Sequence, residues 1–332
     1  MTPETARPRA DETLDTGALA GWLETTVRVE QFPAGHSNLT YLLTTPEGEL
    51  VLRRPPLGPL ALRAHDMARE FRLLSALHPF FPLAPRPIRL CEDLSVLGCP
   101  FFLMERRHGL ILRDHPPPEP DRPSISRAFV ETLAALHTVD TTHPAITALG
   151  RPDGFLVRQT QGWRDRWQRA QPDNAADIDA AFGWLAGHVP PSQNTSVIHN
   201  DFKLDNLMLA FASPARISAV LDWEMATLGD PLFDLGVALT YWRHAPALGL
   251  ATTAPGWWTR DQIVHAYAIR TGYNLTHLPW YELFGVCKLA VIVRQIYVRY
   301  QCGQTSDQRF ARFGEMVLEL GATATRLREQ IS

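Results

Sequence analysis

Five polar residues lie at a spacing that suits one kind of chemistry. They form the pattern His-x-Asp-x-Lys-x-x-Asn and the end of the next strand-like apolar run: His199, Asp201, Lys203, Asn206 and Asp222. Asp201 can accept or orient a hydroxyl proton, and Lys203 can place an ammonium beside an anion. The oxygens of Asn206 and Asp222 are hard ligands of the kind that Mg²⁺ prefers, so we expect them to bind the metal. The pattern predicts phosphoryl transfer, with Asp201, Lys203 and His199 as the catalytic residues.

Each residue taken alone has a plainer explanation. A single Asp before a turn is usually a cap, and a single Asn usually belongs to a turn. The fixed positions His-x-Asp-x-x-x-x-Asn would occur by chance in roughly one chain in a hundred at average residue usage. Lys203 and Asp222 make chance a poor explanation, so we favour a phosphotransferase site. We expect His199 to brace the loop by hydrogen bonds rather than to transfer protons.

The stretch before this loop predicts a small antiparallel sheet with two helices. Apolar and polar residues alternate between clusters of turn residues, as they do in half-buried strands. The expected strands are residues 26–32, 39–44, 49–54, 85–91 and 100–106, and the expected helices are 18–23 and 62–77. Such a sheet could supply a nucleotide site for the loop.

Two parts of this sheet are candidates for binding the nucleotide. Gly35, Ser37 and Asn38 lie in the turn between the first two strands, where small residues let backbone N–H groups approach phosphates. The alternative is a turn that merely connects strands. Met104 and Arg106 lie where the fifth strand ends, in a hinge whose backbone groups could bind an adenine edge.

The third strand ends in two arginines. Alternation places Arg53 and Arg54 on opposite sides, and we expect Arg53 to face the nucleotide and Arg54 to point outward. The planar guanidinium of Arg53 suits phosphate oxygens, although both arginines could equally be solvated strand-end charges. Glu70, in the helix expected at 62–77, could pair with Arg53 or with a charge on its own helix.

The rest of the chain is expected to be mainly helical. Residues 116–123 are rich in proline and are expected to form a linker or ordered loop. The expected helices are 125–137, 155–170, 175–187, 232–242, 260–271, 280–300 and 308–326, with short strands at 195–198, 207–209 and 217–221. We therefore expect an α+β protein with two lobes. Residues 1–108 would form a nucleotide-binding N-lobe with the antiparallel sheet, and residues 109–332 a larger helical C-lobe with the catalytic loop and acceptor site.

Composition narrows the class of partner. The chain has 332 residues and a formal net charge of −3, so it shows no general attraction to nucleic acid. The four cysteines form no CxxC pair, the first residues do not resemble a signal peptide, and no apolar stretch is long enough to span a bilayer. We expect a cytoplasmic protein without a membrane partner. The sequence gives no indication of the oligomeric state.

Several motifs together resemble a known family. They are Gly-His-Ser-Asn-Leu-Thr-Tyr at 35–41, Val-Leu-Arg-Arg-Pro-Pro at 51–56, the loop at 199–206 and Leu-Asp-Trp-Glu at 221–224. From 35 to about 303 the chain resembles the aminoglycoside phosphotransferase-like family, small-molecule kinases with a bilobal, protein-kinase-like fold. The motifs are most similar to a subgroup that includes the kinase domains fused to acyl-CoA dehydrogenases.

The resemblance implies roles for particular residues. It implies Asp201 as the catalytic base, Asn206 and Asp222 as Mg²⁺ ligands, and ATP as the phosphoryl donor. It also implies that Asp234 braces the catalytic loop, and that the acceptor is a hydroxyacyl-CoA or another hydroxylated metabolite. Trp223 and Glu224 replace the Phe-Gly of protein kinases and no Ala-Pro-Glu segment follows, which argues against protein substrates.

Three other functions stay open at this point. They are an aminoglycoside or macrolide antibiotic kinase, a protein kinase, and a catalytically silent nucleotide-binding protein, the last suggested by Arg53 where kinases carry lysine. Residues 280–300 have Glu282 as their only acid, and this argues mildly against a cationic antibiotic. The cations and amide there could meet an anionic acceptor group: Lys288, Arg294, Gln295 and Arg299. Trp163 and Trp167 share one helix face and could flank an acceptor or pack in the core.

Overall fold

The computed structural model describes residues 4–32, 38–57, 65–112, 116–170, 176–248, 252–305 and 307–331. The chain forms two units. The first comprises the described residues up to Leu110 together with Met208–Phe211 and Ser218–Glu224, and the second comprises the remainder. The predicted turn residues Gly35 and Ser37 lie outside the described residues.

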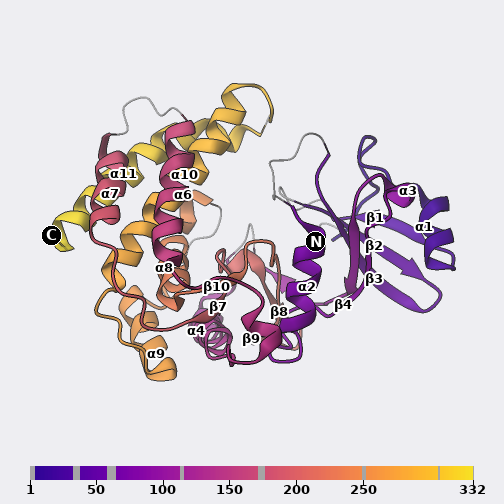
Figure 1. Ribbon diagram of the computed structural model, residues 1–332, viewed down its shortest axis with the longest axis horizontal. Coiled ribbons are helices and arrows are strands. Elements are labelled where there is room, and N and C mark those ends of the chain that lie inside the picture. Colours follow the sequence, from indigo (N-terminus) through magenta and orange to yellow (C-terminus); the bar gives the residue numbers. More distant parts are fainter. Residues whose placement is uncertain are drawn as a thin grey trace. The chain divides into compact units, whose positions relative to one another are not determined.

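The first unit is built on a five-stranded antiparallel sheet of order β1-β2-β3-β5-β4 (Figure 1). Its elements are α1 (Thr16–Leu23), β1 (Arg28–Gln31), β2 (Leu39–Thr45), β3 (Gly48–Arg54), α2 (Met67–Leu77), β4 (Pro87–Cys91), α3 (Leu94–Leu97) and β5 (Phe101–Glu105). All five predicted strands are present. The helix α3 was not expected. It begins where the Asp93 side chain accepts a hydrogen bond from Ser95 N, and ends at Gly98, which has a positive φ.

The two faces of this sheet are covered by different helices. One face packs Tyr41, Leu43 and Leu52 against Leu19 of α1 in a buried apolar cluster. The helix α2 packs against β4 and β5, and its Glu70 contacts Arg53 on the other face. Strand alternation places Arg53 and Arg54 on opposite faces, as predicted, and the face of Arg53 is the one beside α2.

The second unit is mainly helical (Figure 1). Its helices are α4 (Arg122–His137), α5 (Pro144–Thr147), α6 (Phe155–Arg169), α7 (Ala176–Gly187), α8 (Pro231–Leu248), α9 (Arg260–Thr271), α10 (Leu278–Gln301) and α11 (Phe313–Ile331), with the short 3₁₀ turns η1 (Glu119–Asp121), η2 (Leu204–Asn206) and η3 (Gln308–Arg312). The strands β7 (Ser196–Ile198) and β10 (Thr227–Gly229) pair antiparallel on either side of the catalytic loop in sequence. A further sheet of order β6-β8-β9 consists of Leu110–Ile111, Leu207–Ala210 and Ser213–Val220, and its residues are divided between the units.

The helix α10 is the centre of this unit. It packs against α6, α7, α8 and α11, and nearly all residues of its first half are buried. At Gly285 of α10, an added Cβ would lie 2.4 Å from Thr240 Oγ1 and 2.8 Å from the Gly236 carbonyl oxygen, both in α8. Glycine is required here because the backbones of α8 and α10 lie so close together.

Three expectations about this half of the chain can be compared with the structure. The proline-rich stretch does not continue as a loop to residue 123, because α4 begins at Arg122 and tolerates Pro123 in its first turn. The single helix expected at 308–326 is instead η3 followed by α11. The helix start expected near residue 260 is confirmed by a capping box, in which Thr259 and Gln262 are bonded reciprocally.

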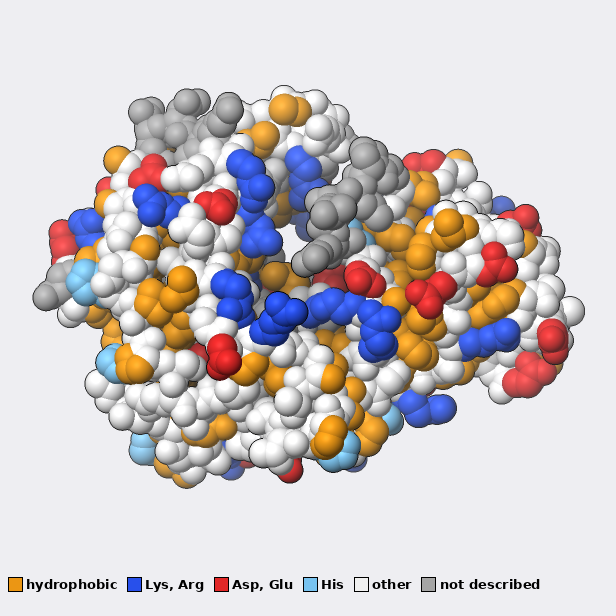
Figure 2. Space-filling view, in the orientation of Figure 1, with side chains coloured by type: hydrophobic (Ala, Val, Ile, Leu, Met, Phe, Trp, Pro, Cys, Tyr) orange, Lys and Arg blue, Asp and Glu red, His pale blue; other side chains and the backbone are white. Residues whose placement is uncertain are grey.

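The described surface carries charges of both signs. Figure 2 shows Lys and Arg side chains among Asp and Glu side chains on the face that it draws, in keeping with the formal net charge of −3. Within the described ranges, no helix combines the length and the apolar character that a bilayer crossing requires.

Candidate active site

In the first unit, Arg53 joins three carboxylates from two parts of the chain. Its Nε lies 3.2 Å from Glu70 Oε2, and its Nη2 lies 2.5 Å from Asp222 Oδ1 and 3.8 Å from Glu224 Oε2. Both Arg53 and Glu70 are buried, so Arg53 is not a solvated strand-end charge and Glu70 is not paired with its own helix. The strand–helix ion pair that the sequence left open is present.

Burial and charge change the proton affinities in this cluster. Burial would lower the pKa of Arg53, but the carboxylates of Glu70, Asp222 and Glu224 outweigh it and raise that pKa. Burial raises the pKa of Glu70 to about 7, against the lowering effect of Arg53. One guanidinium facing three carboxylates leaves surplus negative charge when all are ionised, and a divalent cation would offset it.

Asp222 and its neighbours are held in a specific arrangement. Asp222 has φ 66°, a left-handed conformation that is uncommon outside glycine. The Asn38 amide donates to Glu224 Oε2 at 2.7 Å, and Asn38 Oδ1 lies 2.8 Å from His65 Nδ1. Arg69 Nη1 donates to the Glu224 carbonyl oxygen at 2.9 Å. The Asn38 side chain, predicted as part of a phosphate-binding turn, therefore contacts the segment that carries Asp222.

Arg54 was expected to point outward and does not. It lies on the α1 face of the sheet, where it is 9% exposed and hydrogen-bonds Cys99. The prediction that the two arginines lie on opposite faces was correct. Strand alternation alone, however, does not show that the face of the sheet with Arg54 is also buried.

In the second unit, Asp201 is held by its own loop. Lys203 Nζ lies 3.1 Å from Asp201 Oδ2, and Asn206 Nδ2 donates to the same oxygen at 3.0 Å and to the Asp201 carbonyl at 2.9 Å. The buried Tyr241 of α8 lies beside the Asp201 carboxylate, and burial and the charge of Asp201 raise the pKa of its hydroxyl. Burial would raise the pKa of the Asp201 carboxyl, but the positive charges of Lys203 and Lys288 and the hydrogen bond from Lys203 act in the opposite direction, and the pKa is lowered. Asp201 is thus kept ionised and oriented, as a hydroxyl-orienting carboxylate must be.

The backbone before Asp201 is anchored to α8. Asp234 accepts hydrogen bonds from the backbone N of His199 at 2.6 Å and of Asn200 at 2.9 Å, and it contacts His137 Nε2 at 3.2 Å. The His199 ring is fully buried, and its Nδ1 accepts from Asp201 N at 3.3 Å. These contacts are those expected of a loop brace, both for Asp234 and for His199.

Two residues near Asp201 were missed or misjudged from the sequence. Asn200 has φ 66°, and its amide donates to the Met225 carbonyl oxygen at 2.8 Å. Lys288 was considered as a cation for an anionic acceptor, but it is 1% exposed and donates to the Asn200 carbonyl oxygen. The sequence did contain a signal that Lys288 is unusual, because Lys203 and Lys288 are the two lysines of the whole chain.

The predicted hinge residues Met104 and Arg106 lie at the end of β5 and directly after it, and their side chains already contact other protein groups. Met104 is 9% exposed on β5, opposite Val51 of β3. The Arg106 guanidinium lies 2.5 Å from Glu4 Oε2 and 4.8 Å from the centre of the Phe32 ring. Any nucleotide contact at these positions would therefore use the backbone, and that role stays a prediction.

The tryptophan pair of α6 belongs to the core. Trp163 is 5% exposed and Trp167 fully buried, and the cations of Arg166 and Lys288 lie 4.6 Å and 5.3 Å from the Trp163 ring centre. Glu282 is also buried and accepts two hydrogen bonds from the Arg260 guanidinium, at 2.9 and 2.7 Å. This acid is therefore already neutralised.

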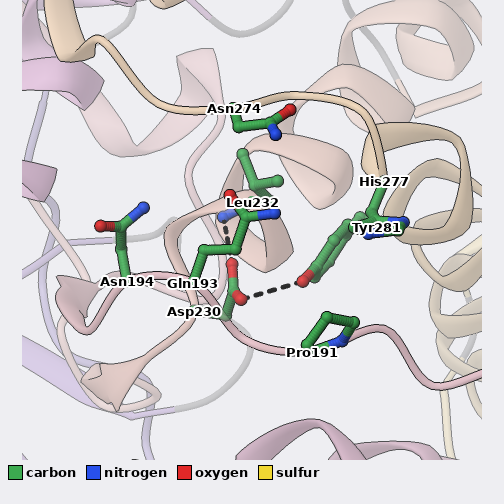
Figure 3. Close-up of a pocket in the computed structure, with 8 residues that line it drawn as sticks. All are labelled: Pro191, Gln193, Asn194, Asp230, Leu232, Asn274, His277 and Tyr281. Atoms are coloured by element: carbon green, nitrogen blue, oxygen red, sulfur yellow. Dashed lines mark hydrogen bonds between the residues drawn. The ribbon is translucent and has the colours of Figure 1, made fainter.

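A small pocket of the second unit surrounds Asp230 (Figure 3). The Asp230 carboxylate accepts hydrogen bonds from Leu232 N and Tyr281 Oη, both at 2.9 Å, and from Ser192 Oγ at 2.8 Å. Each carboxylate oxygen has a donor, so Asp230 fixes the start of α8 to α10. We assign this pocket a structural role.

The oxygen ligands near Asp222 suit Mg²⁺, which usually also binds substrate phosphates, better than a metal that is bound by protein side chains alone. Within the described ranges, no group of three or more His, Cys, Asp or Glu side chains is arranged to hold a metal. Mg²⁺ is commonly bound by one or two protein oxygens together with substrate phosphates, and in the first unit the Asp222 carboxylate offers such an oxygen. The surplus carboxylates around Asp222 fit a cation of this kind.

Comparisons with solved structures identify the fold. A structure from Ralstonia eutropha JMP134, named as a candidate aminoglycoside phosphotransferase, has TM-score 0.83 and 29% identity over 96% of this chain and 99% of that one. A thermostable mutant of aminoglycoside phosphotransferase APH(4)-Ia, in ternary complex with AMP-PNP and hygromycin B, has TM-score 0.64 and 18% identity over 94% and 97%. The expected α+β, protein-kinase-like fold is confirmed.

Curated sequences identify the relatives. Acyl-CoA dehydrogenase family member 11 of Homo sapiens is 33% identical over 317 residues, which cover 92% of this chain and 40% of that protein. The chain spans between 28% and 46% of the length of the first acyl-CoA dehydrogenase relatives that it matches. The predicted likeness to kinase domains fused to acyl-CoA dehydrogenases is confirmed.

The family match agrees with the chemistry of the loop. Residues 28–265 match the Phosphotransferase enzyme family, and this segment includes Arg53, the catalytic loop and Asp222. The expected enzyme class, a phosphotransferase with an alcohol group as acceptor, is confirmed. With most of its length inside this match, the chain belongs to the Phosphotransferase enzyme family.

Proposed function

We propose that the enzyme transfers the γ-phosphoryl group of ATP, with Mg²⁺, to the hydroxyl group of a small molecule. The observation that carries this proposal is the environment of Asp201. Its carboxylate is bound by Lys203 and Asn206, and nearby cations lower its pKa. A carboxylate held in this way can orient an acceptor hydroxyl and take up its proton, with Lys203 beside the transferred group.

On the donor side, Arg53 would contact the phosphates of ATP. The ion pair with Glu70 fixes the guanidinium in one orientation, which suits a planar, two-pronged contact with phosphate oxygens. The backbone of Gly35, Ser37 and Asn38 would approach the same phosphates. The AMP-PNP complex of a protein with the same fold supports ATP as the donor.

Asn206 and Asp222 would hold Mg²⁺. The metal would neutralise phosphate charge during transfer. The surplus of carboxylates over cations around Asp222 supports this assignment. Residues 1–108 would form the nucleotide-binding lobe and 109–332 the lobe with the acceptor, in a cytoplasmic enzyme.

For the acceptor we propose a hydroxyacyl-CoA or another hydroxylated metabolite. The relatives named as acyl-CoA dehydrogenase family members support an acyl-CoA. In the first half of α10, Glu282 is the one acid, and Arg260 neutralises it, so this segment offers no free carboxylate to a cationic antibiotic. The alternative acceptor is an aminoglycoside or macrolide, which the hygromycin B complex of a protein with the same fold favours.

A phosphate-transfer screen tests this function. The full chain is incubated with γ-labelled ATP and Mg²⁺ and with hydroxyacyl-CoAs, choline, sugars, aminoglycosides or macrolides, and labelled product is measured. We expect transfer to a hydroxyacyl-CoA that stops when EDTA removes the metal. Transfer only to an antibiotic would replace the proposed acceptor, and tight ATP binding without any transfer would support a silent nucleotide-binding protein.

A further inference from the structure

The chain uses lysine in a very selective way. Its positive side chains number 32, and the two lysines among them are Lys203 and Lys288. Both lie beside Asp201, and both lower the pKa of its carboxyl. The motif explains Lys203. Lys288 lies on α10, far away in sequence, and no motif explains it.

Lys288 lies at a site that is costly for a cation. Its side chain is 1% exposed, and the rings of Trp163 and Phe233 lie 5.3 Å and 5.9 Å from Nζ. Burial lowers its pKa to about 8, although Asp201 and Asp234 act in the opposite direction. A buried cation has a large desolvation cost, so its presence in the core is weak evidence for a purely stabilising role.

The ammonium of Lys288 holds the peptide that leads into Asp201. Nζ donates to the Asn200 carbonyl oxygen, and the N–H of the same peptide, on Asp201, donates to His199 Nδ1 at 3.3 Å. The peptide before Asp201 is therefore bound through both its oxygen and its nitrogen. Since Asn200 has φ 66°, this peptide is turned in a direction that most residues avoid.

The packing of α8 and α10 brings Lys288 within reach of the loop. Gly285, one turn before Lys288, lies against Gly236 of α8, and Asp234 of α8 binds the backbone N of His199 and Asn200. Asp234 of α8 thus binds two backbone N–H groups of the loop, and Lys288 of α10 binds its Asn200 carbonyl oxygen. A compact ammonium on an unbranched stem fits this enclosed position, whereas a guanidinium is wider.

We propose that Lys288 is a positioning residue for phosphoryl transfer, which fixes the Asn200–Asp201 peptide and so aims the Asp201 carboxylate at the acceptor hydroxyl. This inference rests on the proposed function, because it assigns Asp201 that task. It adds a residue outside the loop motif and explains why a lysine is kept in the core of the second unit. The alternative is that Lys288 only fills space in the core.

The substitution Lys288→Met separates the two possibilities. Methionine is unbranched and of similar length, so the core stays filled while the ammonium is removed. Hydrogen exchange of the peptide 199–206 reports directly on the hold over the loop. The matched control is Val293→Ala, which shortens another buried side chain of α10 without removing a contact to the loop.

We expect the exchange of the 199–206 peptide in Lys288→Met to be faster than any change in the unfolding temperature of the variant accounts for. In the Mg²⁺-dependent hydrolysis of ATP, with water as acceptor, kcat should fall by about 100-fold while the KM for ATP stays within about twofold, the pattern of a misplaced catalytic group. Val293→Ala should lower the unfolding temperature without selectively speeding exchange in the loop.

Wild-type exchange of the 199–206 peptide in Lys288→Met would overturn this role. Faster exchange of this peptide together with an unchanged kcat in Lys288→Met would also overturn this role. Absence of ATP turnover in the wild type would instead contradict the proposed function, and the exchange result would still decide whether Lys288 holds the loop.

Discussion

Arg53 Nε lies 3.2 Å from Glu70 Oε2, and both side chains are buried. The pair connects β3 of the sheet to α2, and Arg53 also reaches Asp222, the predicted metal ligand. An arginine can do this because its fork donates in two directions at once. The cation on β3 therefore links the sheet and α2 to the segment that carries Asp222, the proposed metal ligand, within one unit.

Replacing Arg53 by lysine tests its role toward ATP. The ammonium of the Arg53→Lys variant would keep a positive charge near Glu70, but all its donors lie on one nitrogen, so it lacks the planar, two-pronged contact of the guanidinium. Loss of one charged phosphate contact should cost roughly 1.5–3 kcal/mol, so the KM for ATP should rise by about tenfold or more. Steady-state kinetics at varied ATP concentration give this value. Unchanged nucleotide kinetics in a folded Arg53→Lys variant would show that ATP binding does not need the two-pronged contact of the guanidinium.

The raised pKa of Glu70 predicts how stability depends on pH. The folded-state pKa of about 7 lies above the ordinary value of 4.5, so the folded state binds more protons than the unfolded state between these two values. This group's contribution to the free energy of unfolding should therefore fall as pH rises from 4.5 to 7 and stay low above that range. Glu70→Gln resembles the protonated form and should lose less stability over the same interval.

Urea unfolding at about pH 5 and about pH 8 measures this difference, because the slope with pH reports the protons bound. The control is Glu319→Gln, which changes an exposed glutamate of α11. A Glu70→Gln variant that tracks the wild type at both pH values would show that Glu70 does not carry a raised pKa.

Asn200 should tolerate glycine better than alanine. Both substitutions lose the amide hydrogen bond to Met225, at a cost of about 1 kcal/mol. Alanine must also adopt φ 66°, which costs an L-residue roughly 1–2 kcal/mol more, while glycine adopts it freely. The order of unfolding free energies should be wild type, then Asn200→Gly, then Asn200→Ala. An alanine variant more stable than the glycine variant would contradict the left-handed conformation.

Removing the buried charge of Lys288 should change how stability depends on alkaline pH. The folded-state pKa of about 8 lies below the ordinary 10.5, so charging Lys288 costs the folded state free energy fully below pH 8, and this cost disappears as pH rises to 10.5. In Lys288→Met this contribution to the pH dependence should be absent, whatever the variant loses because the Asn200 carbonyl oxygen no longer has its donor. Thermal unfolding from neutral to alkaline pH tests this, and a variant that keeps the wild-type pH dependence over that range would contradict it.

The sequence predicted those features that depend on local pattern. Strand alternation placed Arg53 on the α2 face, and the motif spacing brought Asp201, Lys203 and Asn206 into one loop. The sequence did not predict contacts that depend on tertiary packing. Helical periodicity put Lys288 among candidate acceptor cations, because a lysine's spacing does not reveal which distant carbonyl its ammonium will reach.

The burial of Arg54 could not be predicted from the pattern of its strand. Arg54 is buried near Cys99 and Tyr41, and no pattern in β3 specifies what covers it. The left-handed backbone at Asn200 and Asp222 could not be predicted either, since each is a common residue whose conformation is imposed by the surrounding contacts.

The most direct test of the central claim is Asp201→Asn, assayed for Mg²⁺-dependent phosphoryl transfer from ATP. Asparagine keeps the shape of the side chain but cannot take up a proton. We predict a loss of kcat of roughly 1,000-fold with ATP affinity, measured by calorimetry, unchanged, whereas Asp179→Asn on the exposed face of α7 should retain wild-type kcat. Wild-type turnover in Asp201→Asn would contradict the assignment of Asp201 and of the loop as the centre of phosphoryl transfer.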